Sequence, residues 1–173
     1  MPKKYHTYIG IDGKRTNFTV FIIHGHSNDW KKIKKYIEDK LKFKVKVLLD
    51  SYAGTTIIDK LRRAIWEESD CAVAIMSADD LLVNETKNPR PNVLLEIGYT
   101  QGFFDHLYWY SDKINPVVLL KEDLAAIPSD LNGVEYLEYS QKTKISKVFP
   151  QLKQALENLY KQVKKYYEPK KRK

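Results

Sequence analysis

The order of hydrophobic and polar positions along the chain predicts alternating strands and helices. Short apolar runs, typical of strands covered on both faces, alternate with segments whose apolar residues recur every three or four positions. The predicted strands are residues 19–23, 45–49, 71–76, 116–120 and 134–137. Such alternation is typical of an α/β fold, in which helices cover both faces of a parallel sheet.

One helix is predicted after each of the first three strands, and another at the end of the chain. The third of these helices is expected over residues 92–104. The apolar stripes of the first, second and last helices are Trp30, Ile33, Ile37 and Leu41; Ile57, Leu61, Ala64 and Ile65; and Leu152, Leu156, Leu159 and Val163. Thr56 and Asp59 have the spacing of a capping box at the start of the second helix. Pro150 is expected in the first turn of the last helix, where a proline is tolerated.

Two polar loops are expected to open at the same edge of the sheet. In a flavodoxin-like sheet with strand order 2-1-3-4-5, the crevice lies between the carboxyl ends of the first and third strands. The loops that leave these ends, residues 24–29 and 77–92, carry most of the groups able to bind or react. We therefore expect the functional site at this edge.

Glu96 lies inside an apolar helical segment, where a charged side chain is costly unless it is paired or used. Asn92 and Tyr99 share its helical face, which we expect to look into the crevice beside the loop 24–29. A structural ion pair between Glu96 and Arg90, or a lysine, is the alternative interpretation.

A lone carboxylate restricts the chemistry. Ordinary glycosidases need two carboxyl groups, because one must protonate a poor leaving group. In NAD the nicotinamide nitrogen is already cationic and departs neutral, so one carboxylate that stabilises the developing oxocarbenium charge can suffice. We expect Glu96 to be catalytic. The expected substrate-binding residues are His24, Gly25, His26, Asp29, Asp79, Asp80, Asn92 and Tyr99.

The loop 24–29 precedes a helix, so its backbone N–H groups suit a pyrophosphate, and Gly25 permits close approach. His24 and His26 could be metal ligands, but no further His or Cys is positioned to complete a site, and no metal is predicted. Asp79 and Asp80 either orient a ribose or a substrate base or cap a turn.

Length and composition fit one globular domain. The chain has 173 residues, 43% of them hydrophobic, and no apolar run long enough to span a bilayer. Its single cysteine, Cys71, allows no intrachain disulfide, which favours a cytoplasmic location.

The net charge of +8 is concentrated at the end of the chain, where residues 161–173 carry +6. A basic tail on a nearly neutral body is typical of a solvated helix end, so neither nucleic acid nor a membrane is an expected partner. We divide the chain into an N-terminal extension (1–17), a domain (18–160) and the basic tail (161–173).

Five sequence blocks occur in one order: residues 20–26, 54–58, 77–80, 92–99 and 128–134. Together they resemble the bacterial family of predicted nucleotide-binding proteins with a TIR-like domain, which includes TIR domains fused to STING-like sensors in antiphage defence. The resemblance spans residues 19–139. It implies a flavodoxin-like TIR fold and NAD hydrolase activity, with the family's catalytic glutamate at Glu96.

The resemblance also implies NAD+ as substrate with no further cofactor, and assembly as a homo-oligomer or with a sensor protein. Two positions depart from the family pattern. His26 stands where the family often has an arginine, which bears on phosphate contact. Asn92 stands where many TIR enzymes have a tryptophan; the STING-associated branch also has an asparagine there.

Two other functions remain open at the level of sequence. A nucleoside 2-deoxyribosyltransferase would use Glu96 as a covalent nucleophile and would need a second acid, for which Asp79 or Asp80 could serve. A non-catalytic module that binds a nucleotide signal or a TIR partner would not need the charge of Glu96.

Overall fold

The computed structural model describes residues 18–48, 56–66, 68–82, 86–108, 115–131 and 134–167. The strands are β1 (Thr19–His24), β2 (Lys44–Val47), β3 (Cys71–Met76), β4 (Asp80–Leu81), β5 (Lys87–Asn88), β6 (Val117–Glu122) and β7 (Tyr136–Tyr139). The α-helices are α1 (Asp29–Tyr36), α2 (Ile57–Trp66), α3 (Pro91–Tyr108) and α4 (Phe149–Tyr167). Shorter helical segments are a π-helix (Ile37–Leu41) and two 3-10 helices (Ser129–Leu131 and Ile145–Val148).

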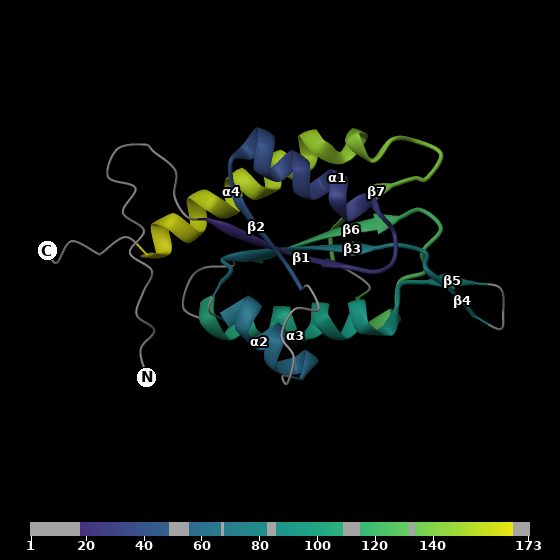
Figure 1. The fold of residues 1–173 in the computed structure, drawn as a ribbon, viewed down its shortest axis with the longest axis horizontal. Coiled ribbons are helices and arrows are strands. Elements are labelled where there is room, and N and C mark those ends of the chain that lie inside the picture. Colours follow the sequence, from purple (N-terminus) through teal and green to yellow (C-terminus); the bar gives the residue numbers. More distant parts are fainter. Residues whose placement is uncertain are drawn as a thin grey trace, which may run out of the picture.

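Five strands form one parallel sheet in the order β2-β1-β3-β6-β7. Counted along the chain, this is the predicted order 2-1-3-4-5, so the flavodoxin-like prediction is confirmed. Figure 1 shows α1 and α4 on one face of the sheet and α2 and α3 on the other. The carboxyl ends of all five strands therefore meet at one edge, as expected of parallel strands joined by helical crossovers.

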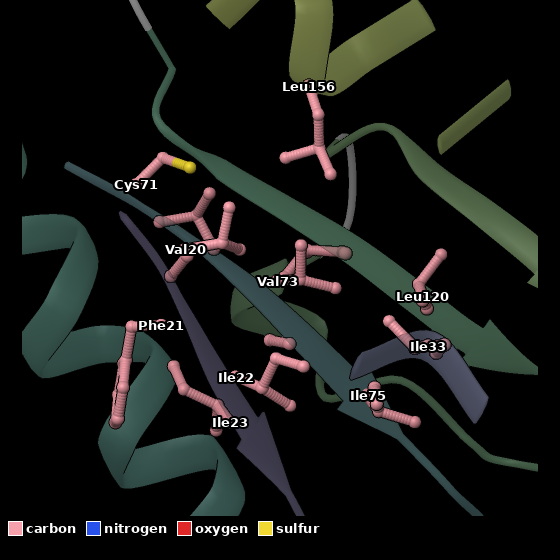
Figure 2. Packing of buried hydrophobic residues seen from close by; sticks show 14 of the residues in the cluster. Val20, Phe21, Ile22, Ile23, Ile33, Cys71, Val73, Ile75, Leu120 and Leu156 are labelled. Carbon is pink, nitrogen blue, oxygen red and sulfur yellow. The ribbon is translucent and has the colours of Figure 1, made fainter. Parts of the chain in front are cut away.

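The hydrophobic core is centred on β1 and β3. All six residues of β3 are buried, and so are the four interior residues of β1, because both strands are covered on both faces. In Figure 2, Val20 and Val73 lie on the side of Leu156 from α4, whereas Phe21 and Ile23 lie toward a helix of the opposite layer. The alternation of side chains along β1 thus fixes which layer each residue contacts.

Several element boundaries differ from the prediction. The loop after β3 contains a small antiparallel hairpin, β4–β5, which was not predicted. The third helix extends to Tyr108, and the last strand lies two residues later than expected. Ile57 was expected in the apolar stripe of α2 but is 62% exposed, because contact with the core begins one turn later, at Leu61.

The helix ends follow the sequence closely. The Thr56 hydroxyl accepts a hydrogen bond from the Asp59 N–H (3.1 Å) and donates one to its carboxylate (2.6 Å), a cap at the start of α2. Pro150 is the second residue of α4, as predicted. Lys164 and Lys165 lie in the last turn of α4, where cations are favourable.

The limits of the predicted domain fall partly beyond the structure. Both ends of the chain, residues 1–17 and 168–173, lie outside the described residues. So do the first two positions, 54 and 55, of the sequence block 54–58. Val163 is buried, so α4 packs on the core beyond the predicted boundary at residue 160. No helix in the described ranges is long and apolar enough to cross a membrane.

The position of Cys71 leads to a direct prediction. Burial raises the pKa of its thiol well above the ordinary value, and the Asp70 carboxylate raises it further. Because the thiolate is the reactive form, a thiol reagent should label the folded chain far more slowly than the chain unfolded in guanidinium, where one thiol per chain should react. Fast stoichiometric labelling of the folded protein would show that this end of β3 is open.

Candidate active site

Asp79 joins the two loops that the sequence placed at the carboxyl edge of the sheet. Its Oδ2 accepts a hydrogen bond from the backbone N–H of His26 (3.0 Å) and another from the Ser77 hydroxyl (2.8 Å). The loop after β1 is therefore held against the loop after β3. The structure confirms that these two loops lie together.

Gly25 is required by the same contact. A Cβ at this position would lie 1.8 Å from Asp79 Oδ2 and 3.0 Å from its Cγ. The carboxylate cannot simply rotate away, because it would lose its bonds to His26 and Ser77. Gly25 thus permits the close approach of two protein segments.

Glu122 and Tyr139 also belong to this edge, although the sequence did not mark them. Glu122, at the end of β6, is 1% exposed and accepts a hydrogen bond from the Ala78 N–H through Oε2 (2.8 Å). Its Oε1 and the Tyr139 hydroxyl are both buried without a hydrogen-bond partner within the described structure. Two neighbouring unpaired polar atoms are typical of a place where a buried water or ligand atom binds.

Several carboxylates act on the Tyr139 hydroxyl. Burial raises the pKa of Tyr139, and the carboxylates of Glu122, Asp29 and Asp79 raise it further. Asp29, in the first turn of α1, is paired with Lys32 at 2.9 Å. It therefore lies at the same edge, but engaged with its own helix.

The His24 ring faces the α1 layer. It is the last residue of β1 and stacks on Trp30 of α1, with ring centroids 4.5 Å apart. Its Nδ1 donates to the Gly25 carbonyl oxygen (2.7 Å). Burial lowers its pKa, although this bond and the Asp79 carboxylate act in the opposite direction. In the described ranges, no group of three His, Cys, Asp or Glu residues could hold a metal ion.

Asp80 is placed differently from Asp79. It forms the first residue of β4 and pairs with Asn88 of β5. Its backbone therefore stabilises the hairpin, whereas Asp79 joins the loops.

Glu96 lies in the second turn of α3 and is half-buried. Within the described structure its carboxylate has no hydrogen-bond or ion-pair partner, and no Arg90–Glu96 pair within 4.0 Å is present. Burial raises its pKa from 4.5 to about 7, and the Arg90 charge lowers it only in part. A desolvated, unpaired carboxylate of this kind is typical of a functional site rather than a structural one.

Asn92, Glu96 and Tyr99 share one face of the continuous helix α3, as the sequence predicted. Asn92 is exposed, and Tyr99 is half-buried against the core. The Tyr99 hydroxyl accepts a hydrogen bond from Arg62 Nε of α2 at 3.4 Å. This face of α3 is therefore directed along the side that contacts α2.

The predicted site residues thus fall into two groups. His24, His26, Asp29 and Asp79 are joined at the carboxyl edge, with the His24 ring on the α1 layer. Glu96, Asn92 and Tyr99 lie on α3, in the opposite layer (Figure 1). Among the described residues, no hydrogen bond or ion pair joins Glu96 to the first group, so their joint action on one substrate remains a prediction.

With the fold and these two groups established, comparison with known proteins identifies the family. Residues 19–141 match the family described as CAP12/Pycsar effector protein, TIR domain. The chain belongs to this family. The match therefore includes all five strands of the parallel sheet, the β4–β5 hairpin and the whole of α3.

Two curated proteins resemble the TIR domain in sequence. Protein tirC of Dictyostelium discoideum is 30% identical over 148 residues, which cover 77% of this chain and 70% of tirC. The uncharacterized protein YuaY of Escherichia coli is 31% identical over 129 residues, which cover 70% of this chain and 40% of YuaY. The chain therefore spans less than half of YuaY.

The fold is also found in a solved structure. The TIR domain of the Toll-related receptor TRR-2 from Hydra magnipapillata aligns with a TM-score of 0.52 at 14% identity, covering 84% of this chain and 97% of that one. At this level of identity the likeness shows a shared TIR fold.

The contact between Gly25 and Asp79 can be tested by a double-mutant cycle. Gly25→Ala should lower the free energy of unfolding by about 1–3 kcal/mol, because the new methyl group overlaps the Asp79 carboxylate. In an Asp79→Ala background the same substitution should cost clearly less. Chemical denaturation measures all three variants.

Gly102→Ala is the matched control, because a Cβ there meets nothing within 4 Å. In the middle of α3 it should stabilise the protein by about 0.5–1 kcal/mol. Equal costs of Gly25→Ala in both backgrounds would mean that Asp79 is not the group that requires the glycine.

Proposed function

We propose that this TIR domain hydrolyses NAD+ at the nicotinamide–ribose bond, with Glu96 as the catalytic carboxylate. The observation that carries the proposal is that Glu96 is half-buried and without a hydrogen-bond or ion-pair partner in the described structure, with a pKa raised to about 7. Such a carboxylate gains most from a ligand that brings positive charge. NAD+ does so, and more positive charge develops on its ribose as the bond breaks.

The reaction needs few groups from the protein. The bond between the anomeric carbon and the nicotinamide nitrogen breaks, and its electron pair neutralises the pyridinium ring. The ionised Glu96 carboxylate stabilises the oxocarbenium charge left on the ribose. A water then bonds to the anomeric carbon, releases its proton to solvent or to Glu96, and gives ADP-ribose; an internal nucleophile would give a cyclic product instead.

The placement of the other acids favours this reaction over deoxyribosyl transfer. Transfer from an ordinary deoxynucleoside needs an acid beside the nucleophile to protonate the leaving base. Asp79 is engaged with His26 and Ser77, and Asp80 lies in the β4–β5 hairpin. Neither is hydrogen-bonded to Glu96 within the described structure, whereas NAD+ cleavage requires no such acid.

The family supports the biological part of the proposal. The family is one of effector proteins, and the sequence resemblance implies NAD+ hydrolysis in antiphage defence or signalling. We propose that the active form is a homo-oligomer or an assembly with a sensor protein. Asn92 and Tyr99, which share the face of Glu96, are the residues of α3 that we expect to position the substrate.

Replacement of Glu96 tests the proposal. Glu96→Gln keeps the size of the side chain but removes its charge, so nicotinamide release should fall by about a hundredfold to a thousandfold. Asp105→Asn, at an exposed position of the same helix, should leave the rate unchanged. Chromatography of the products of NAD+ incubation under crowding, which promotes assembly, measures both variants.

The same variant has a predictable effect on stability. Because the folded state holds the Glu96 proton up to a pH of about 7 and the unfolded state only to about 4.5, ionisation destabilises the fold as the pH rises through this window. Glu96→Gln should therefore be more stable than wild type above pH 7 and equal to it below pH 4.5. If Glu96→Gln loses activity and also has a lower free energy of unfolding than wild type at pH 8, the variant is misfolded. If the variant is stable and still releases nicotinamide at the wild-type rate, the mechanism is contradicted.

A further inference from the structure

A second candidate site lies on the opposite layer from Glu96. A cavity of about 490 Å³ opens where α1, the π-helix after it, the 3-10 helix Ile145–Val148 and the start of α4 come together. Nothing in the proposed NAD+ reaction uses it. Its volume lies within the range of small-molecule binding sites.

The floor of the cavity is formed by apolar and aromatic side chains. The rings of Tyr36 and Phe149 stack with centroids 4.0 Å apart and planes 17° from parallel. The Tyr36 hydroxyl donates a hydrogen bond to the Phe149 carbonyl oxygen (3.2 Å), which fixes the pair. Ile145 lies beside them and is buried. Such a wall suits a flat, apolar part of a ligand.

The rim of the cavity is positively charged. Lys35, Lys40 and Lys144 line it, and within the described structure none of them has an ion-pair partner. A fourth lysine, Lys32, is already paired with Asp29. Asp39 is the one acidic residue of the lining, so the cavity carries an excess of positive charge that a neutral ligand would not use.

The backbone at the rim is also unusual. Lys40 belongs to the five-residue π-helix Ile37–Leu41, which continues α1. The segment ends at Lys42, whose φ of 61° lies in the left-handed region. π-Helical turns are rare and occur frequently at functional sites.

We propose that this cavity binds an aromatic anion of nucleotide size. The flat ring of the ligand packs against Tyr36 and Phe149, and its phosphate accepts hydrogen bonds from the rim lysines Lys40 and Lys144. The aromatic wall and the lysines are both needed for this selectivity. The wall alone would not select an anion, and the lysines alone would not select an aromatic ring.

The test uses the full chain and adenosine monophosphate as the probe, with adenosine and inorganic phosphate as its separate halves. Calorimetry should show that the nucleotide binds at least about tenfold more tightly than either half. Amide chemical shifts should change at 35–40 and 144–149. Lys40→Glu and Lys144→Glu should each weaken binding by about tenfold, because each replaces a charge-assisted hydrogen bond by repulsion.

Lys164→Glu is the matched control, since Lys164 is an exposed lysine of α4 away from the cavity lining. It changes the net charge equally and should leave the affinity unchanged. Binding should also persist in Glu96→Gln, so this proposal and the NAD+ proposal can fail separately.

Three results would overturn the inference. An equal loss in Lys164→Glu would mean nonspecific attraction to a basic protein. Shift changes confined to α3 would place the nucleotide at the Glu96 site instead. Binding of an acidic peptide, but not of the nucleotide, at residues 144–149 would assign the cavity to a protein partner.

Discussion

The double covering of β1 and β3 is the constraint on which the rest of the structure depends. Helices pack on both faces of these strands, and all six residues of β3 are buried. A polar side chain can therefore reach solvent only near the ends of the strands. Parallel strands bring their carboxyl ends to one edge, where the sequence changes from apolar to polar. Asp79 and Glu122 hold this edge together through hydrogen bonds to backbone N–H groups of the loops.

The strands and their order could be predicted because each strand is a short apolar run, and because right-handed crossovers leave few topologies. The hairpin β4–β5 could not, since it depends on backbone pairing of two-residue strands that carry no hydrophobic pattern. Glu122 was missed for a related reason. Its partner, the Ala78 N–H, is 44 residues away in sequence, and only the β3–β6 pairing brings the two together.

For the candidate site, the signal in the sequence is the charge of Glu96 within an apolar helix, and the structure shows this carboxylate half-buried without a hydrogen-bond or ion-pair partner in the described ranges. The separation of the site residues into two layers was not predictable from the loops alone. The apolar run predicts that His24 lies in a loop, but it is the last residue of β1, and strand alternation directs its ring to Trp30 of α1. A difference of one residue at a strand end decides which layer a side chain contacts.

The central claim is that the fold holds Glu96 as an unpaired, partly desolvated carboxylate ready to receive positive charge. Carbon-13 NMR of the labelled Glu96 carboxyl group measures this directly. The account predicts a titration midpoint of about 7 in the free protein, and a lower midpoint when a non-hydrolysable NAD+ analogue brings its pyridinium charge into the site. A midpoint near the ordinary 4.5, unchanged by the analogue, would contradict it.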